Sequence, residues 1–169
     1  MGSQTKQLRI WTRWALLVPY RHQEREDSCG PACVQMLLAW QGQKQSQRAL
    51  YQLLQTNSQI GTTRTHILHA LRALGFAFKV EAKLSVPQLR KWLHHGPVLV
   101  RFMEPKEQVH HYAVAVGTHA DQLLLHDPWN GKNILMHWGE FARLWRQVSR
   151  KPKTGGWAVL FPAKIQRFR

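Results

Sequence analysis

The stretch Asp27-Ser28-Cys29-Gly30-Pro31-Ala32-Cys33 carries the strongest signal in this chain, and an apolar run over residues 34–40 follows it. The apolar run predicts a buried helix that begins close to Cys29. At the start of a helix, unpaired backbone N–H groups and the helix dipole favour a negative charge. A cysteine in that position is suited to act as a thiolate nucleophile, so Cys29 is the first candidate for a reactive residue.

Helical patterns occupy the first half of the chain and strand patterns the second half. Ser28 and Pro31 are typical of a helix start, and Gly42 is typical of its end. Further helices are predicted after Ser46, over 67–74, over 87–94 and over 139–148. Strands are predicted over 76–82, 97–102, 112–116, 122–125 and 157–161, with turns over 117–121 and 128–132. The expected fold class is therefore α+β, with N-terminal helices packed on a C-terminal antiparallel sheet.

Length and composition indicate one globular domain. The chain has 169 residues, 44% of them hydrophobic, and only two cysteines. No apolar stretch is long enough for a membrane span, and the apolar segment 10–20 lacks the cleavage site of a signal peptide. Two cysteines form no disulfide framework, which favours a reducing, cytoplasmic location. We expect an N-terminal extension over 1–20, a domain over 21–163 and a basic tail over 164–169.

The net charge of +15 predicts an affinity for anionic partners. Nucleic acid, lipid headgroups and acidic polypeptides all satisfy that description. The basic residues are scattered singly, however, and do not alternate with aromatic residues in one block. This spacing argues against a sequence-specific nucleic-acid site.

A cysteine nucleophile needs a histidine, and His111 is the best candidate. It begins the predicted strand 112–116, whereas His110 points to the opposite face because strand residues alternate. Asp127 ends the next strand and could fix the His111 ring if the two strands pair. Gln23, six residues before Cys29, could donate a side-chain N–H to an oxyanion together with the Cys29 backbone N–H.

These residues together resemble the C39 family of cysteine peptidases, which are papain-like domains that remove double-glycine leader peptides from bacteriocin precursors in bacteria. The resemblance rests on Gln23, Cys29-Gly30, His111-Tyr112, Asp127-Pro128 and the segment 93–98. It extends over about residues 21–161. Exporter-fused members carry an acid directly before the cysteine, whereas Ser28 intervenes here, as stand-alone relatives tolerate.

The resemblance implies a papain-like fold and a role for each of four residues. Cys29 would be the nucleophile, His111 the general base and acid, Asp127 the orienting group and Gln23 the oxyanion donor. The implied substrate is a peptide or protein, with a double-glycine leader as the model. No cofactor and no metal are implied. The chain contains no membrane domain and no ATPase, so the substrate of the exporters does not follow automatically.

Alternative interpretations of the same residues remain. Cys33 fits the core, Asp127 before Pro128 fits a turn, and Gln23 alone fits a solvated loop. A zinc site from the two cysteines and two histidines is disfavoured because His110 and His111 face opposite ways. Tyr112, Trp129 and Gly30 are expected to line a substrate groove that favours small residues at the cut.

The sequence therefore predicts a cysteine peptidase that cleaves beside small or glycine residues. Two other functions stay open. The first is a basic, toxin-type domain that binds or processes nucleic acid. The second is an adaptor that binds a peptide without hydrolysing it. Transamidation by the acyl-enzyme is a variant of the peptidase hypothesis, and the oligomeric state is not predicted.

Overall fold

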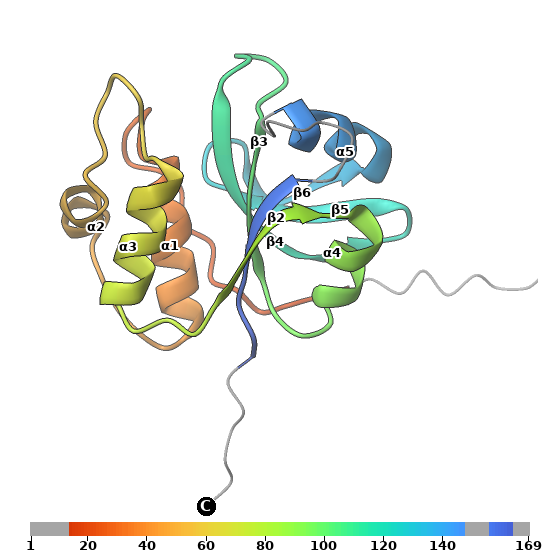
Figure 1. The fold of residues 1–169 in the computed structure, drawn as a ribbon, viewed down its shortest axis with the longest axis horizontal. Coiled ribbons are helices and arrows are strands. Elements are labelled where there is room, and N and C mark those ends of the chain that lie inside the picture. Colours follow the sequence, from red (N-terminus) through yellow and green to blue (C-terminus); the bar gives the residue numbers. More distant parts are fainter. Residues whose placement is uncertain (1–13, 148–155, 164–169) are drawn as a thin grey trace, which may run out of the picture.

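The computed structural model describes residues 14–147 and 156–163. The predicted basic tail 164–169 and most of the predicted N-terminal extension lie outside these residues. In the described part, one antiparallel sheet lies between two groups of helices (Figure 1). The helices α1 (Cys29–Trp40), α2 (Gln47–Leu53) and α3 (Arg64–Ala73) cover one face, whereas α4 (Val86–Trp92) and α5 (Trp138–Gln147) cover the other. The α+β fold class and the N-terminal helices on a C-terminal sheet are confirmed.

The sheet has the order β2-β7-β3-β4-β5-β6, and a short strand, β1, also pairs with β4. All neighbouring strands run antiparallel. Because β4 and β5 are antiparallel neighbours, the first residues of β4 and the last residues of β5 lie side by side at the same end of the strands. The strand bounds are β1 (Trp14–Ala15), β2 (Lys79–Leu84), β3 (Val98–Met103), β4 (His110–His119), β5 (Gln122–Asp127), β6 (Gly131–His137) and β7 (Gly156–Leu160).

Two hydrophobic clusters hold the layers together. Strand residues alternate between the two clusters, as a pleated strand requires. Leu99 and Tyr112 face the cluster under α1–α3, whereas Val100 and Ala113 face the cluster under α4 and α5. The sheet is therefore covered on both faces, and its central strands are a rigid support for side chains at their ends.

Several element boundaries differ from the sequence-based prediction. The first long strand begins at Lys79 and not at residue 76, because Phe76 packs its ring edge against Phe161 before the strand starts. Residues 117–119 belong to β4, and residues 131–132 belong to β6, where turns were predicted. Strand β6 was not predicted at all. It is the edge strand of this sheet, and its half-exposed residues give only a weak hydrophobic pattern.

Gly96 connects α4 to β3 at a point where no side chain fits. A Cβ atom there would overlap the backbone carbonyl of Phe161. Hydrogen bonds on both sides, from Phe161 N to Pro97 O and from Ala163 N to His95 O, hold the two segments together. The glycine is therefore required by close backbone approach.

We expect Gly96→Ala to lower the free energy of unfolding by about 3 kcal/mol, since the two segments must move apart to admit the methyl group. Urea unfolding followed by circular dichroism measures this change. Gly139→Ala is the matched control, because a Cβ at Gly139 in α5 meets no heavy atom within 4 Å. The control should be as stable as the wild type or slightly more stable. Equal stability of the Gly96 variant and the wild type would contradict the account.

Candidate active site

Cys29 is the first residue of α1 and is partly exposed. Ser28 occupies the N-cap position, but its side chain does not cap the helix. Its hydroxyl instead accepts a hydrogen bond from Arg25 N and donates one to Arg25 O, both at 3.0 Å. This closes the turn before the cysteine and leaves the N–H groups of the first helical turn without a side-chain acceptor from Ser28.

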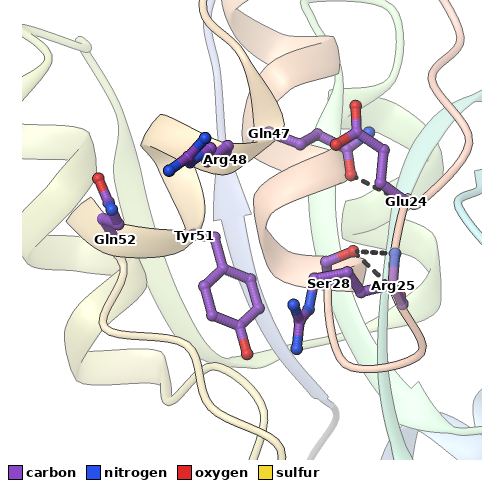
Figure 2. A pocket seen from close by; sticks show the side chains of 7 residues that line it. All are labelled: Glu24, Arg25, Ser28, Gln47, Arg48, Tyr51 and Gln52. Carbon is purple, nitrogen blue, oxygen red and sulfur yellow. Dashed lines mark hydrogen bonds between the residues drawn. The ribbon is translucent and has the colours of Figure 1, made fainter.

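The turn before Cys29 is also fixed from the side of α2. Asp27 Oδ2 accepts a hydrogen bond from Tyr51 Oη at 2.6 Å, and Asp27 Oδ1 accepts one from Arg25 Nε at 3.3 Å. Arg25, Ser28 and Tyr51 line a cavity of about 300 Å³ between this turn and α2 (Figure 2). The acid near the cysteine therefore supports the turn, and the cavity behind it contains neither Cys29 nor His111.

His111, near the start of β4, is buried with 6% of its surface exposed. Its Nε2 lies 2.8 Å from Asp127 Oδ1, and the ring borders the same cavity as Cys29, whose nearby thiol helps to raise the pKa of His111. Because Nε2 faces Asp127, Nδ1 is the ring nitrogen left for the cysteine. The ring of Phe102 packs edge-on against the imidazole at 5.7 Å. His111 is thus held between the thiol and the carboxylate.

His110 is paired with Arg101 and borders the same cavity as Cys29 and His111. It is exposed, and Arg101 Nη2 lies 2.6 Å from its Nδ1. Cys33, one turn after Cys29, is fully buried, which confirms its place in the core. Burial raises the pKa of Cys33 well above its usual value. In the part of the chain that the structure describes, no three His, Cys, Asp or Glu side chains gather in a way that could hold a metal ion.

Asp127 is buried, and its carboxylate makes four hydrogen bonds. Oδ1 accepts from His111 Nε2, from Trp129 N at 2.9 Å and from Asn130 N at 3.0 Å, and Oδ2 accepts from Asn130 Nδ2 at 3.1 Å. The carboxylate therefore closes a turn and contacts His111 at the same time. Tyr20 Oη donates to the backbone carbonyl of Asp127 at 3.0 Å and fixes the turn from outside. The roles of Asn130 and Tyr20 in supporting Asp127 were not predicted from the sequence. Only Asn130 offered a signal, because an asparagine shortly after Asp-Pro is typical of a turn.

The His111–Asp127 pair is ionised by its surroundings. Burial alone would lower the pKa of His111, but hydrogen bonds with Asp127 and Cys29 and the charges of both groups raise it to about 10. Burial would likewise raise the pKa of Asp127, but the hydrogen bond and charge of His111 and the bonds from Asn130 lower it below its usual value. The two groups thus stabilise each other as an imidazolium and a carboxylate.

Gln23 is buried, and its side-chain amide is already engaged. Nε2 donates to Arg25 O at 2.8 Å and to Glu26 O at 2.9 Å. Oε1 has no hydrogen-bond partner among the described residues. The backbone of Gln23 donates to Pro128 O at 3.0 Å, which joins the segment before Cys29 to the segment after Asp127. Gln23, the predicted oxyanion donor, therefore lies where these two segments meet, but both hydrogens of its side-chain amide are bonded to backbone carbonyls.

Two cavities lie beside His111. The first, of about 490 Å³, is lined by Cys29, Gly61, Thr62 and Tyr112 among others. The second, of about 460 Å³, is lined by Gln23 and Trp129 but not by Cys29. Both are bordered by His111, Glu26 and Val109. Because they share these three lining residues, we call the two adjoining cavities the groove.

The residues predicted to line the groove differ in their placement. Trp129 is 48% exposed and stacks on His22, so its ring is available at the rim. Tyr112 borders the first cavity but is 2% exposed, and its ring packs edge-on against Trp157. Gly30 borders neither cavity. It lies under Thr62, whose Oγ1 would be 2.5 Å from a Cβ at this position, so close packing explains the glycine.

The pKa shifts predict how the stability of the pair depends on pH. The raised pKa of His111 gives a contribution that is complete below about pH 6.5 and is lost as the pH rises toward 10. The lowered pKa of Asp127 gives a contribution that is present above about pH 4 and is lost below it. We expect the difference in unfolding free energy between wild type and Asp127→Asn to be largest near pH 6 and to shrink toward pH 10.

Urea unfolding at pH 6, 8 and 10 measures this difference. Asp121→Asn is the matched control, because Asp121 pairs with His137 on the exposed surface at 3.3 Å. An exposed pair of this kind contributes little at any pH. A wild-type advantage over Asp127→Asn that stays constant from pH 6 to pH 10 would contradict the ionised pair.

Comparisons with solved structures give the same fold. The peptidase domain of Streptococcus ComA, a bifunctional ABC transporter involved in a quorum-sensing pathway, is 26% identical with a TM-score of 0.70. The match covers 85% of this chain and 96% of that domain. A putative C39-like peptidase from Bacillus anthracis matches with a TM-score of 0.68 at 14% identity, over 89% of this chain and 97% of that one.

A third structure is a double-glycine-motif protease from an AMS/PCAT transporter in complex with the leader peptide. Its TM-score is 0.66 at 20% identity, over 90% of this chain and 96% of that one. A search of the curated proteins found no match. No described helix is long and apolar enough to cross a membrane. The sequence profile of the Peptidase C39 family matches residues 17–151, which is most of the chain. The chain therefore belongs to the peptidase C39 family and is a cysteine peptidase.

Proposed function

We propose that this peptidase cleaves a peptide after a small residue, glycine above all, by means of Cys29, His111 and Asp127. The observation that carries the proposal is that one buried imidazole is hydrogen-bonded to a carboxylate and borders the same cavity as a partly exposed thiol at the start of a helix. This is the arrangement that nucleophilic catalysis by cysteine requires. The pKa of His111, raised to about 10, keeps the imidazole protonated at neutral pH, so it can donate a proton to the leaving amine.

The proposed reaction has two steps. In the first, the Cys29 thiolate forms a bond to the scissile carbonyl carbon, and the peptide C–N bond breaks. The leaving amine takes the proton from His111 Nδ1, which leaves a thioester on Cys29 and a neutral imidazole. In the second step, His111 removes a proton from water, the hydroxide attacks the thioester carbon, and the C–S bond breaks to restore the thiolate. Asp127 holds the ring through Nε2 during both steps.

The negative oxygen formed in each step needs donors. The backbone N–H of Cys29 is one, because it belongs to the open first turn of α1. Gln23 Nε2 is the second. Its amide donates to Arg25 O and Glu26 O in the free protein, so one of these hydrogen bonds has to give way when the oxyanion forms.

A peptide substrate fits the groove better than a nucleic acid does. The two cavities beside His111 are lined by four acidic residues, Glu26, Asp27, Glu104 and Glu107, and by one arginine, Arg101, so the excess of negative charge repels phosphate. Ile60 and Val109 border the first cavity and are 63% and 54% exposed, so apolar peptide side chains can bury them. The solved relative with a bound leader peptide favours a double-glycine leader as the model substrate.

The peptidase proposal also favours a cytoplasmic location and leaves room for a second, anionic partner. Cys29 and Cys33 are both free thiols, which suits the reducing cytoplasm. The basic surface of a chain with net charge +15 remains available to an acidic or anionic partner outside the groove.

Wild type should cut double-glycine leader peptides directly after the second glycine, and Cys29→Ala should cut none of them, since it has no nucleophile. A panel of such peptides, analysed by mass spectrometry, tests this. Peptides in which the second glycine is replaced by leucine should be cut at least about tenfold more slowly, because a larger side chain must fit beside Cys29.

Three other results would overturn the proposal. Turnover by Cys29→Ala would exclude the thiol as nucleophile. Binding of peptide with equal affinity by both proteins, with no turnover, would indicate a non-hydrolytic adaptor. RNA binding that weakens steeply with salt, without peptide cleavage, would indicate a nucleic-acid-binding domain.

A further inference from the structure

We propose that the second cavity, lined by Gln23, His111 and Trp129, is a subsite for a positively charged side chain on the residue that follows the scissile bond. Lysine and arginine are the side chains that satisfy this description. The inference rests on the proposed function and defines the substrate of the same site more closely.

The position of this cavity relative to the reacting groups assigns it to the leaving side. The acyl part of the substrate becomes bonded to Cys29, which borders the first cavity. The leaving amine takes its proton from His111, which borders both cavities. The second cavity touches His111 without touching Cys29, so it is the side toward which the residue after the cut extends.

The charge of this cavity is opposite to that of the whole molecule. Glu26, Glu104 and Glu107 are three of its seven lining residues, although the chain has only nine acidic residues and a net charge of +15. Among the described residues, no lysine or arginine lines it. The one cationic group, His111, is already paired with Asp127. The cavity therefore presents negative charge to a ligand.

The carboxylate of Glu104 is already held in place by the protein without a ligand. Glu104 follows β3 and is 5% exposed, and its Oε2 accepts hydrogen bonds from the backbone N–H groups of Lys106 and Glu107 at 2.7 and 2.6 Å. The backbone of Gln108 closes the same loop by donating to Glu104 O at 3.0 Å. Gln23 Nε2 also donates a hydrogen bond to the backbone carbonyl of Glu26 at 2.9 Å. Binding a cation there requires little ordering of the protein.

Two further features of the lining match a cation. Trp129 is half-exposed, and the face of an indole ring attracts ammonium and guanidinium groups. Gln23 is 4% exposed, and its Oε1, an acceptor, is the one polar atom of that side chain without a partner among the described residues. Carboxylates, an amide oxygen and an indole face all favour a hydrogen-bond donor with positive charge, and none of them favours an anion.

Three peptides test the subsite. They share one double-glycine leader segment and differ only in the residue after the second glycine, which is lysine, norleucine or glutamate. With wild type we expect kcat/KM for the lysine peptide to exceed that for norleucine by at least about fivefold, and the glutamate peptide to be the slowest. The preference should shrink between 0.05 and 0.5 M NaCl, because salt screens partly exposed charges.

The variant that tests the residues is E26Q combined with E107Q, since both side chains are exposed and the amide has the same shape. In this variant the ratio of the lysine rate to the norleucine rate should fall to about one. E81Q combined with D121N is the matched control, because Glu81 and Asp121 pair with Lys79 and His137 away from both cavities and the double change alters the net charge equally. The control should keep the wild-type ratio.

A binding measurement separates failure of the subsite from failure of the peptidase proposal. Fluorescence anisotropy with Cys29→Ala should give tighter binding of the lysine peptide than of the glutamate peptide, by at least about fivefold. If wild type cuts none of the peptides, the proposed function fails, and these affinities decide on the subsite. If the peptides are cut at equal rates, or are uncut and bind equally or not at all, the subsite is refuted.

Discussion

The hydrogen bond between His111 Nε2 and Asp127 Oδ1, 2.8 Å long and almost fully buried, is the interaction on which the rest of the site depends. Burying an ion pair is costly unless each group keeps its hydrogen bonds. Asp127 meets that condition with three further bonds from Trp129 N and from the backbone and side chain of Asn130. The bond to Asp127 and the nearby thiol of Cys29 raise the pKa of His111, so its ring stays protonated. The pair is stable because the turn after β5 is built around the carboxylate.

This constraint explains why the catalytic residues come from distant parts of the chain. The antiparallel pairing of β4 with β5 brings His111 beside Asp127, and packing of α1 against the sheet brings Cys29 to the same edge. The backbone hydrogen bond from Gln23 N to Pro128 O joins the segments on either side of the groove. A substrate that enters the groove therefore meets groups that the sheet and α1 already hold in place, as efficient catalysis requires.

Much of this arrangement could be predicted from the sequence because it follows from local patterns. Alternation along a strand separated His111 from His110, and the helix pattern after Cys29 placed the thiol at a helix start. What could not be predicted depends on contacts between segments. The hydrogen bonds of Gln23, the burial of Gly30 under Thr62 and the support of Asp127 by Tyr20 have no periodicity in the sequence. Strand β6 was missed because an edge strand with half-exposed residues lacks a clear alternation.

Alkylation of the thiols by iodoacetamide tests whether Cys29 and His111 act as one reactive pair. At pH 7.5, followed by peptide mapping, wild type should be modified at Cys29 and not at the buried Cys33. His111→Ala should slow modification of Cys29 by at least about tenfold, and the neighbouring variant His110→Ala should not, with circular dichroism to show that both are folded. Asp127→Asn should also slow it if His111→Ala does not fold. Equal reactivity of Cys29 in wild type and in the folded His111 or Asp127 variant would contradict the account.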